Sequence, residues 1–368
     1  MASTRQSALA ARHKALGSPL GDWNGMDMAW EYDQDVNAEH RAVRTAAGLF
    51  DVSGLKKMHI TGPDALAALD HLCTRDLTKV YPGKSVYALI LHEEGGITDD
   101  CIMFHIKPND WLMVHGGGTG RDQLAKSAEG KDISIQFDDD LHDISLQGPK
   151  AVDFLDRHTP IDLPSLKYFH QVPTTLFSQD CMISRTGFSG ERGYEIFASA
   201  DNVVPIWDAI LDQGKPEGII PCSFNCLDML RVEAALLFYP YDMNERHSPW
   251  ELDLGFAVAK NKEADFRGKA ACFAKKGNEK IKNFGVVADS DQAVEFEAGV
   301  FADGERIGEV TAPMYSTVLN QSLAMVQITP PYAKPGVKVE IKGETLSCTA
   351  TTHSLPFYDP GKYLRSDN

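Results

Sequence analysis

Residues 85–106, with the sequence SVYALILHEEGGITDDCIMFHI, give the clearest indication of the local fold in this part of the chain. Its two arms, 85–91 and 97–106, are rich in residues that favour β-strands, and the loop between them contains two adjacent glycines. This arrangement predicts a β-hairpin. Side chains of neighbouring strand residues point to opposite faces of a sheet, so Asp99 and Asp100 cannot act as a pair of carboxylates on one face.

Asp100 is the better candidate of the two for a functional role. It shares its strand face with Ile102, Phe104 and Ile106. A carboxylate on an apolar face is costly unless it is hydrogen-bonded or lines a pocket. A second interpretation remains open, in which Asp99 and Asp100 both cap the turn of the hairpin.

Outside the hairpin, predicted strands and helices intermix without a regular βαβ rhythm, which indicates an α+β protein. Residues 225–238 form the strongest predicted helix. Leu227 and Leu230 fall on its apolar stripe, and Ser223 or Asn225 is available as the N-cap.

The pattern changes after about Lys275. The predicted strands become short and are separated by turn residues such as Asp303-Gly304 and Pro335-Gly336. This pattern predicts a small all-β domain at the C-terminal end of the chain, either a sandwich or a barrel.

The chain of 368 residues is acidic, with 52 Asp and Glu against 36 Lys and Arg and a formal net charge of −16. Phosphate backbones and anionic membranes select basic surfaces, so this charge argues against binding to nucleic acid or to a membrane. No apolar run is long enough to span a membrane, and the N-terminal 25 residues do not have the pattern of a secretory signal. The seven scattered cysteines suit reduced thiols, so we expect a cytoplasmic protein.

No spacing of histidines or cysteines predicts a metal site. Cys222 and Cys226 could supply one pair of ligands, but no second pair of Cys or His stands near them in the sequence, so we expect buried thiols. The loop HGGGTG at 115–120 lacks the third glycine of a dinucleotide fingerprint and the partner motif of a hydrolase. It predicts only a mobile or ligand-adjacent loop.

Two further charged residues stand on otherwise apolar elements. Glu195 shares a predicted strand face with Phe197 and follows a glycine-rich bend at 184–193, which could approach a ligand or could form a long hairpin with a surface ion pair. Arg231 lies on the apolar stripe of its helix, where a guanidinium needs an anionic partner. Asp228, three residues earlier, or the carboxylate of a ligand could be that partner.

These pieces, in this order, resemble the folate-dependent aminomethyltransferase family, also called the glycine-cleavage T-protein family, which includes tetrahydrofolate-dependent demethylases. The matching segments cover nearly the whole chain: GLFDVS at 48–53, GGITDD at 95–100, LQGPKA at 146–151, SRTGFSGE at 184–191, GYE at 193–195, DMLRVEA at 228–234, SPWE at 248–251 and FRGK at 266–269. One such motif would be weak evidence for the family, whereas this many motifs in the same order make the resemblance specific.

The resemblance implies an α+β fold in which three domains form a cloverleaf around a central folate site. Residues 1–274 would form the folate-binding catalytic region, built from two interwoven α+β subdomains of which the second covers roughly 52–140. Residues 275–368 would form a C-terminal domain resembling a β-barrel or jelly roll.

The resemblance also implies tetrahydrofolate as the cofactor that accepts a one-carbon unit. Asp100 would lie beside the N5/N10 edge of the folate and help to handle the proton of the nucleophilic amine. Glu195 would accept hydrogen bonds from the pterin ring. The folate site would be lined or supported by Tyr87, Phe188 and Arg231.

The sequence departs from the T-protein pattern where the one-carbon donor would bind. Gly54 stands where the family usually has histidine, Met26 stands in place of a tryptophan close to Trp23, and the segment from Gly116 to Thr119 replaces one that carries asparagines. The resemblance therefore implies donor binding by Trp23, Met26, Gly116 and Thr119.

These departures favour a demethylase that moves a methyl group to N5 of tetrahydrofolate from a small N-, O- or S-methylated metabolite, such as a sulfonium propionate, a betaine or a methoxyaromatic compound. The first alternative is a glycine-cleavage aminomethyltransferase, which would take its carbon from a lipoylated carrier protein, release ammonia and form 5,10-methylene-tetrahydrofolate. The second alternative is a folate-binding protein without transferase activity.

Overall fold

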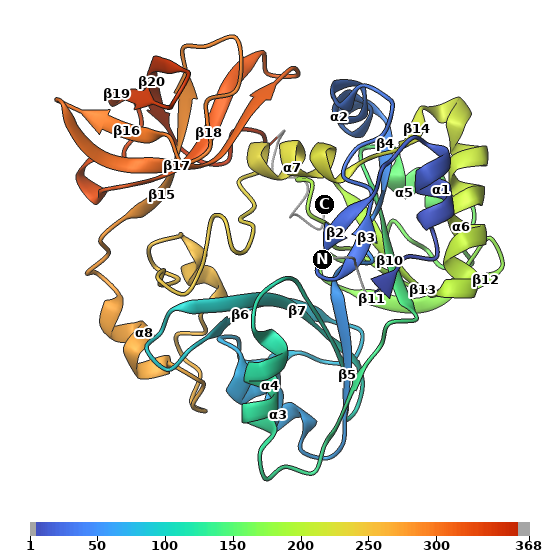
Figure 1. The fold of residues 1–368 in the computed structure, drawn as a ribbon. Coiled ribbons are helices and arrows are strands. Elements are labelled where there is room, and N and C mark those ends of the chain that lie inside the picture. The colour runs from blue at the N-terminus through green and yellow to red at the C-terminus, as the bar shows by residue number, and fades with distance from the viewer. Residues whose placement is uncertain (1–4, 360–368) are drawn as a thin grey trace.

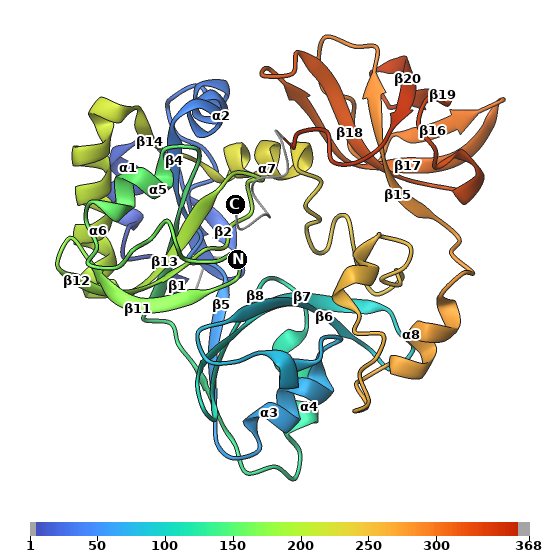
Figure 2. The same cartoon turned by 180° about the vertical axis from the view of Figure 1, so that it is seen from behind.

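The computed structural model describes residues 5–359, and three lobes surround a common centre (Figure 1). The first lobe is built on a six-stranded sheet, the second on a five-stranded sheet, and the third is a closed barrel. Helix α7 (Phe224–Glu233) lies between the first lobe and the barrel in both views (Figure 2). This mixed architecture confirms the predicted α+β class.

The sheet of the first lobe has the strand order β11-β12-β13-β10-β4-β14. Helices α5 and α6 cover one face of this sheet and share a buried apolar cluster with it. The other face carries polar side chains, which include Ser145 and Glu195. The bounds are β4 (Ala47–Asp51), β10 (Leu141–Gln147), α5 (Ala151–Asp156), β11 (Gln171–Leu176), β12 (Gln179–Ser184), β13 (Gly193–Ser199), α6 (Ala200–Gly214), η2 (Lys215–Glu217) and β14 (Ile219–Pro221).

The second lobe is inserted between β4 and β10, which pair antiparallel in the first lobe. Its sheet has the order β6-β7-β8-β5-β9, and α3 and α4 contribute to the apolar cluster on one face. The predicted hairpin is β6 and β7, with Leu89 opposite Asp100. The bounds are β5 (Lys56–Thr61), α3 (Ala65–Leu72), η1 (Leu77–Lys79), β6 (Ser85–Leu91), β7 (Ile97–Lys107), β8 (Asp110–His115), α4 (Gly120–Ala128) and β9 (Ser134–Phe137).

The third lobe is a closed six-stranded barrel in the order β15-β18-β17-β16-β19-β20. It confirms the β-rich C-terminal domain that the short strands and turn residues predicted. A connecting segment with η3 and α8 precedes it. The bounds are η3 (Leu254–Ala257), α8 (Lys269–Lys275), β15 (Lys282–Ala288), β16 (Gly299–Ala302), β17 (Glu305–Ser316), β18 (Gln321–Ile328), η4 (Pro330–Tyr332), β19 (Lys338–Lys342) and β20 (Ser347–His353).

The N-terminal segment adds a small three-stranded sheet and two helices to the first lobe. The sheet has the order β1-β3-β2, and β2 and β3 form a tight hairpin at Asn24 and Gly25. The bounds are β1 (Arg5–Gln6), α1 (Ala10–Ala15), β2 (Gly21–Trp23), β3 (Met26–Met28) and α2 (Val36–Thr45). None of the helices within the described residues has the length and apolar character needed to cross a membrane.

Helix α7 is shorter than the sequence pattern predicted. Its N-cap is Ser223, one of the two expected candidates, but it ends at Glu233 instead of continuing to Phe238. Ala235 has a φ of 56°, in the left-handed region that ends helices, and the Leu236 N–H donates back to the Arg231 carbonyl. The chain therefore turns back after α7 and can return toward the centre of the molecule.

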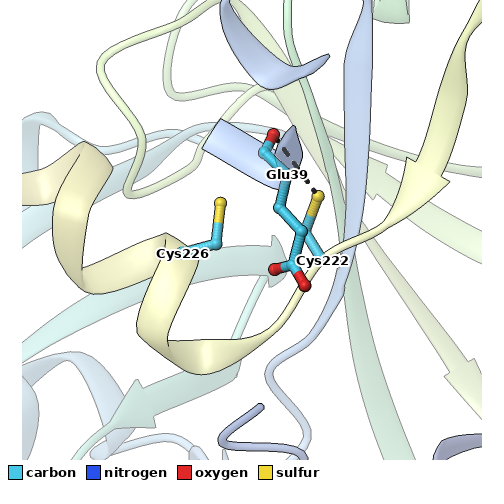
Figure 3. Close-up of side chains that lie close together, drawn as sticks. All are labelled: Glu39, Cys222 and Cys226. Atoms are coloured by element: carbon cyan, nitrogen blue, oxygen red, sulfur yellow. Dashed lines mark hydrogen bonds between the residues drawn. The ribbon is translucent and has the colours of Figure 1, made fainter. Parts of the chain in front are cut away.

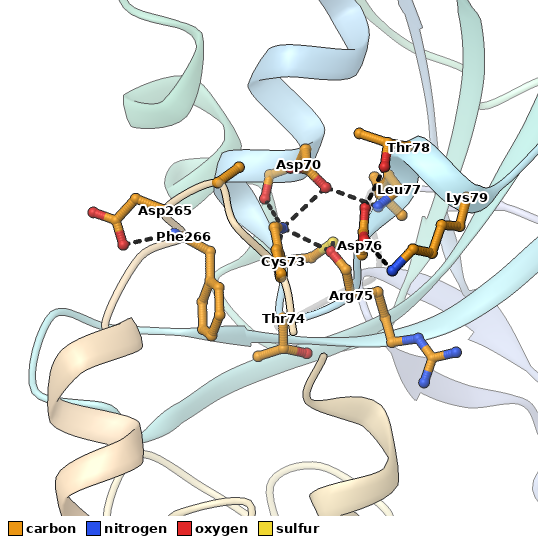
Figure 4. Close-up of polar contacts among 12 residues, drawn as sticks. Asp70, Cys73, Thr74, Arg75, Asp76, Leu77, Thr78, Lys79, Asp265 and Phe266 are labelled. Atoms are coloured by element: carbon orange, nitrogen blue, oxygen red, sulfur yellow. Dashed lines mark hydrogen bonds and ion pairs between the residues drawn. The ribbon is translucent and has the colours of Figure 1, made fainter. Parts of the chain in front are cut away.

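The connecting segment is anchored to the second lobe by a buried lysine. The Lys262 ammonium lies 2.9 Å from a carboxylate oxygen of Asp70, and it donates to the backbone carbonyls of Cys73 and Arg75 at 3.1 and 2.7 Å (Figure 4). These carbonyls follow the C-terminal end of α3, where a cation is favourable. The lysine thereby fixes the loop at 73–76 beside the sheet.

Candidate functional site

Asp99 and Asp100 have separate structural settings on β7. Asp99 is buried, and its Oδ2 lies 2.8 Å from Nδ1 of His115 and accepts a 2.8 Å hydrogen bond from the Gly120 N–H. It thus joins the end of β8 to the start of α4. Asp100 points to the opposite face, as the alternation of the strand predicted. The interpretation in which both residues cap the hairpin turn does not describe this arrangement.

Asp100 lies beside a tyrosine on the neighbouring strand. Tyr87 stands on the same face, and its hydroxyl hydrogen-bonds to the Asp100 carboxylate. Burial, together with the charge of Asp99, raises the pKa of Asp100 to about 7, and the hydrogen bond from Tyr87 opposes this rise. Asp100 can therefore gain or lose a proton near neutral pH, which is the property required of a general acid or base.

Glu195 occupies the middle of the polar face of the first lobe. It stands on β13 between Ser145 and Ser184 and is 7% exposed. The hydroxyl of Thr186, in the bend at 184–193, donates to its Oε2. Burial raises the pKa of Glu195 to about 7, against the effect of the Thr186 hydrogen bond. Glu195 is therefore a buried acceptor, held in place by Thr186.

A contact between two phenylalanines brings these two faces together. Phe104 shares the strand face of Asp100, Phe197 shares the strand face of Glu195, and their rings meet edge to face with centroids 5.3 Å apart. The sheets of the first and second lobes therefore turn the faces of Asp100 and Glu195 toward a common junction. Sequence patterns predicted each face separately but contained no signal for their contact.

The N-terminal hairpin β2-β3 packs against two of the places where the sequence departs from the T-protein pattern, Gly54 and the glycine loop at 116–118. A Cβ atom at Gly54 would lie 2.4 Å from the Trp23 ring, so the indole fills the space of a side chain at position 54. A Cβ atom at Gly117 would lie 3.0 Å from Asn24, whereas at Gly116 it would meet nothing within 4 Å. Trp23 and the glycine loop are thus brought together.

The other predicted site residues have more varied settings. Phe188 is half-buried, with its ring 6.4 Å from that of Phe238. Met26 is only 1% exposed and lies in the core. Thr119 is the N-cap of α4, and its buried hydroxyl lacks a hydrogen-bond partner within residues 5–359. Donor binding by Met26 and Thr119 stays a prediction.

Arg231 is held by carboxylates of the chain itself. Its Nε donates to Asp228 at 2.8 Å and its Nη1 donates to Asp242, which is completely buried. Asp242 also accepts a 2.7 Å hydrogen bond from Thr311 of the barrel. The Asp228 partner was among the predicted alternatives, whereas Asp242 was not. Direct folate binding by Arg231 stays a prediction, and these contacts give it a supporting role between α7 and the barrel.

Two residues that lie near the site, Tyr239 and Asp143, were not predicted from the sequence. Tyr239 lies within the electrostatic range of Asp100, because burial and then the charges of Glu245, Asp99 and Asp100 raise its pKa to about 12. Asp143 is completely buried on the same face as Glu195, and neither of its oxygens has a hydrogen-bond partner within the described chain.

The sequence contains a signal for Asp143 but none for Tyr239. The alternation of Asp143, Ser145 and Gln147 along β10 marks a polar strand face and could have identified Asp143. Nothing in the sequence around Tyr239 indicates the left-handed turn at Ala235 that brings the chain back after α7.

A buried ionic cluster holds the bend at 184–193 against α7. The Arg44 guanidinium donates to Glu191 at 2.8 Å, to the Ser189 carbonyl at 2.9 Å and to Glu233 at 2.7 Å. The second carboxylate oxygen of Glu233 accepts a hydrogen bond from Ser316 of the barrel. Arg44 therefore connects α2, the bend that carries Thr186, and α7.

The two cysteines considered as metal ligands do come together with an acidic residue. Glu39, Cys222 and Cys226 are buried, and one ligand atom from each lies within 4.8 Å of the others (Figure 3). The Glu39 carboxylate already accepts hydrogen bonds from the Ser223 N–H, the Ser223 hydroxyl and Gln34. Burial raises the pKa of the Cys222 thiol well above its usual value. The Glu39 carboxylate and the two buried thiols therefore pack together at the start of α7.

The raised pKa values of Asp100 and Glu195 predict a pH-dependent loss of stability. In the unfolded chain these carboxyls titrate near pH 4, so between about pH 4 and pH 7 the folded protein binds more protons and becomes less stable as the pH rises. Asp100→Asn and Glu195→Gln remove these groups. At pH 8 the Tm of each variant should exceed that of wild type, by roughly 1–3 °C for each kcal/mol of stability that the ionised carboxylate costs wild type. At pH 5 the increase in Tm should be smaller. A difference in Tm that does not change with pH would contradict this assignment.

Comparison with known proteins places the chain in a family. Residues 9–262 match the GCVT N-terminal domain, and residues 282–359 match the glycine cleavage T-protein C-terminal barrel domain. The heme-dependent oxidative N-demethylase gamma subunit of Ectopseudomonas mendocina is 50% identical, over 99% of this chain and 98% of that protein. The aminomethyltransferase of Streptomyces coelicolor is 35% identical, over 97% and 99% of the two chains.

A solved structure agrees with these sequence matches. The crystal structure of glycine cleavage system aminomethyltransferase T from Bartonella henselae superposes with a TM-score of 0.89 and 26% sequence identity, over 97% of this chain and 99% of that one. The match covers all three lobes. The chain therefore belongs to the glycine cleavage T-protein family of transferases, as its motifs predicted.

Proposed function

We propose that this protein is a tetrahydrofolate-dependent one-carbon transferase whose carbon comes from the N-methyl group of a small amine. The observation that carries the proposal is the junction at which Phe104 meets Phe197, because it turns Asp100 and Glu195 toward one site. Among N-, O- and S-methylated donors, an N-methyl compound is favoured by the 50% identical relative, which is named as part of an N-demethylase.

The residues at the junction fit tetrahydrofolate. Its pterin ring carries adjacent N–H donors, and the buried Glu195 carboxylate, steadied by Thr186, supplies the matching acceptor. When bound, tetrahydrofolate supplies the nucleophilic N5 amine that takes up the carbon. Tyr87 and Phe188 are half-buried aromatic residues that pack against neighbouring apolar clusters, and we propose that they supply aromatic surface to the folate.

Asp100 has the properties needed to take the proton that an amine loses when it forms a new bond to carbon. It is half-buried, its pKa is raised to about 7, and Tyr87 fixes its carboxylate by a hydrogen bond. A base whose pKa lies near the working pH transfers protons efficiently in both directions. The rigid β6-β7 hairpin holds Asp100 in one position, which favours a defined reaction geometry.

The donor side suits a small molecule. Trp23 fills the space above Gly54, and the glycines at 116–118 leave this side without large side chains. An aromatic ring beside a glycine-rich loop offers contact to a small methylated amine. These features support a free metabolite as the carbon source.

A partner protein would supply the carbon in an activated form. The 50% identical relative is named as the gamma subunit of an oxidative enzyme, so we propose that this chain works beside an oxidising subunit in the cytoplasm. A two-electron oxidation by that subunit would bring the methyl carbon to the level of formaldehyde, and the product would be 5,10-methylene-tetrahydrofolate. Transfer of an intact methyl group, which the sequence favoured, would give 5-methyl-tetrahydrofolate.

A second candidate is glycine-cleavage aminomethyl transfer. It is supported by the 35% identical aminomethyltransferase, which aligns over almost the whole chain. In that case a lipoylated carrier protein would be the partner, and ammonia would be released.

The test supplies the protein with tetrahydrofolate and one carbon source at a time. The sources are formaldehyde, a panel of N-methylamines with and without the oxidising partner, sulfonium propionates, and an aminomethylated lipoyl carrier. Methylene product that forms from formaldehyde or from oxidised N-methylamine faster than in the reaction without this protein supports the proposal, whereas 5-methyl product supports direct methyl transfer. Product with the carrier alone would replace the proposal by the second candidate. Folate binding without any product would point to a non-catalytic protein.

A further inference from the structure

A chain with a net charge of −16 must offer a local cation to bind a folate, because the p-aminobenzoyl-glutamate tail of folate is anionic. Arg231 is already neutralised by Asp228 and Asp242. Another cation near Asp100 is therefore needed, if the proposed function is correct. The inference below rests on that function.

Arg75 is a guanidinium without a carboxylate partner in the described part of the chain. Its Nη1 donates to the Phe256 carbonyl at 2.6 Å, which leaves its charge uncompensated. The adjacent Asp76 is paired with Lys79 at 2.7 Å, and Asp70 is paired with Lys262. Figure 4 shows the Arg75 guanidinium pointing away from this network. Burial lowers the pKa of Arg75, as expected where no carboxylate stabilises the charge.

Phe256, whose backbone carbonyl accepts the hydrogen bond from Arg75, carries an exposed aromatic ring. This side chain is 67% exposed, although neighbouring residues of η3 such as Leu254 and Ala257 are buried. Its ring lies 6.2 Å from that of Tyr87, with an angle of 26° between the planes. Tyr87 in turn hydrogen-bonds to Asp100. An uncovered ring stacked on the partner of the proposed catalytic residue indicates a surface that a flat ligand can cover.

Arg75 lies beyond the edge of the sheet that carries Asp100, on the side of strand β6. Asp100 is on β7, and Tyr87 is on β6, the edge strand of the sheet. The Thr74 N–H donates to the Leu89 carbonyl at 3.0 Å, so the loop that carries Arg75 runs along the outer side of β6. Two strand spacings, about 10 Å, separate this loop from β7. A benzoyl group followed by a carboxylate spans a comparable length.

We propose that Arg75 and Phe256 form the binding site for the anionic aryl tail of the folate. Phe256 packs against the p-aminobenzoyl ring, and Arg75 pairs with a carboxylate of the glutamate tail. In this arrangement Glu195 would hold the pterin, Asp100 would face the reactive edge, and the edge strand β6 would carry the tail outward. Arg75 thereby determines specificity for folates over pterins that lack a tail.

The experiment compares two ligands that differ only in the features that the site would recognise. Tetrahydrofolate carries the aryl ring and glutamate, and 6-methyltetrahydropterin lacks both. Calorimetry gives the Kd of each ligand for wild type, Arg75→Gln, Arg75→Lys, Phe256→Ala and the control Arg306→Gln, whose arginine lies on the barrel in an exposed pair with Glu309. The Tm of each variant verifies folding.

Arg75→Gln should weaken tetrahydrofolate binding about tenfold, because a charge-assisted hydrogen bond is lost, and should leave the Kd of 6-methyltetrahydropterin unchanged. Arg75→Lys should fall between wild type and Arg75→Gln. Phe256→Ala should weaken tetrahydrofolate about three- to tenfold. The loss in Arg75→Gln should shrink at high salt, where charges are screened.

Unchanged tetrahydrofolate affinity in Arg75→Gln would overturn this inference and leave the proposed function intact. Equal losses for both ligands would also overturn it, since they would show a general effect on the site. Failure of wild type to bind either ligand would instead contradict the proposed function.

Discussion

Replacing Asp100 by asparagine should lower kcat by about 10²- to 10⁴-fold, the usual contribution of a positioned general base. The Kd for tetrahydrofolate should change little, because asparagine keeps the shape of the side chain and can still accept the hydrogen bond from Tyr87. Initial rates with formaldehyde, after subtraction of the rate without protein, together with calorimetric titration of tetrahydrofolate, separate the two effects. Equal losses of turnover and affinity would contradict the assigned role.

The neighbouring aspartate offers a matched control for this substitution. Asp99→Asn makes the same chemical change one residue away, on the opposite face of β7. It should lower the Tm, because the Asp99 carboxylate contacts His115 and the Gly120 N–H at 2.8 Å each. Asp100→Asn should keep or raise the Tm. If Asp99→Asn instead reproduced the kinetic defect without loss of stability, the division of roles between the two residues would be wrong.

The second large effect concerns the buried ionic cluster around Arg44. Arg44→Met should lower the free energy of unfolding by about 3–5 kcal/mol, because it leaves the buried Glu191 carboxylate without its cation and the buried Glu233 carboxylate with only the His40 ring, 3.0 Å away, as a basic partner. Both carboxylate side chains are at most 1% exposed. Urea unfolding followed by tryptophan fluorescence measures the change. The loss should also weaken folate binding, since Arg44 fixes the bend that carries Thr186.

An exposed arginine provides the comparison for this variant. Arg306→Met breaks a pair with Glu309 in which both side chains are about half exposed, and exposed pairs contribute about 0–1 kcal/mol. A change of less than about 1 kcal/mol in Arg44→Met would show that water enters the cluster when the cation is removed.

The sequence was sufficient to select the two carboxyls as candidates. Asp100 was predicted because it shares a strand face with Ile102, Phe104 and Ile106, and Glu195 because it shares a predicted strand face with Phe197 after a glycine-rich bend. Their burial and raised pKa values follow from that placement. Motifs in register then predicted the family and the closed C-terminal barrel.

The remainder of the site depends on contacts between distant segments. The partners of Arg231 include Asp242, which lies beyond a left-handed turn that no motif marks. Trp23 replaces a side chain at Gly54 only because the N-terminal hairpin folds over that loop. Arg75 is an ordinary surface residue in the sequence, and its relation to Phe256 depends on how the connecting segment crosses the second lobe.

The insertion of the second lobe between β4 and β10 has a consequence for the order of folding. These strands pair, at Asp51 and Ile144 for example, although the whole lobe separates them in the chain. Non-local pairing is slow, and a lobe that has already folded brings the two strands together. We expect the β6-β7 hairpin to gain protection against hydrogen exchange before β4 and β10 during refolding. Asp100, the proposed catalytic residue, would then be in place before the sheet that carries Glu195 closes around it.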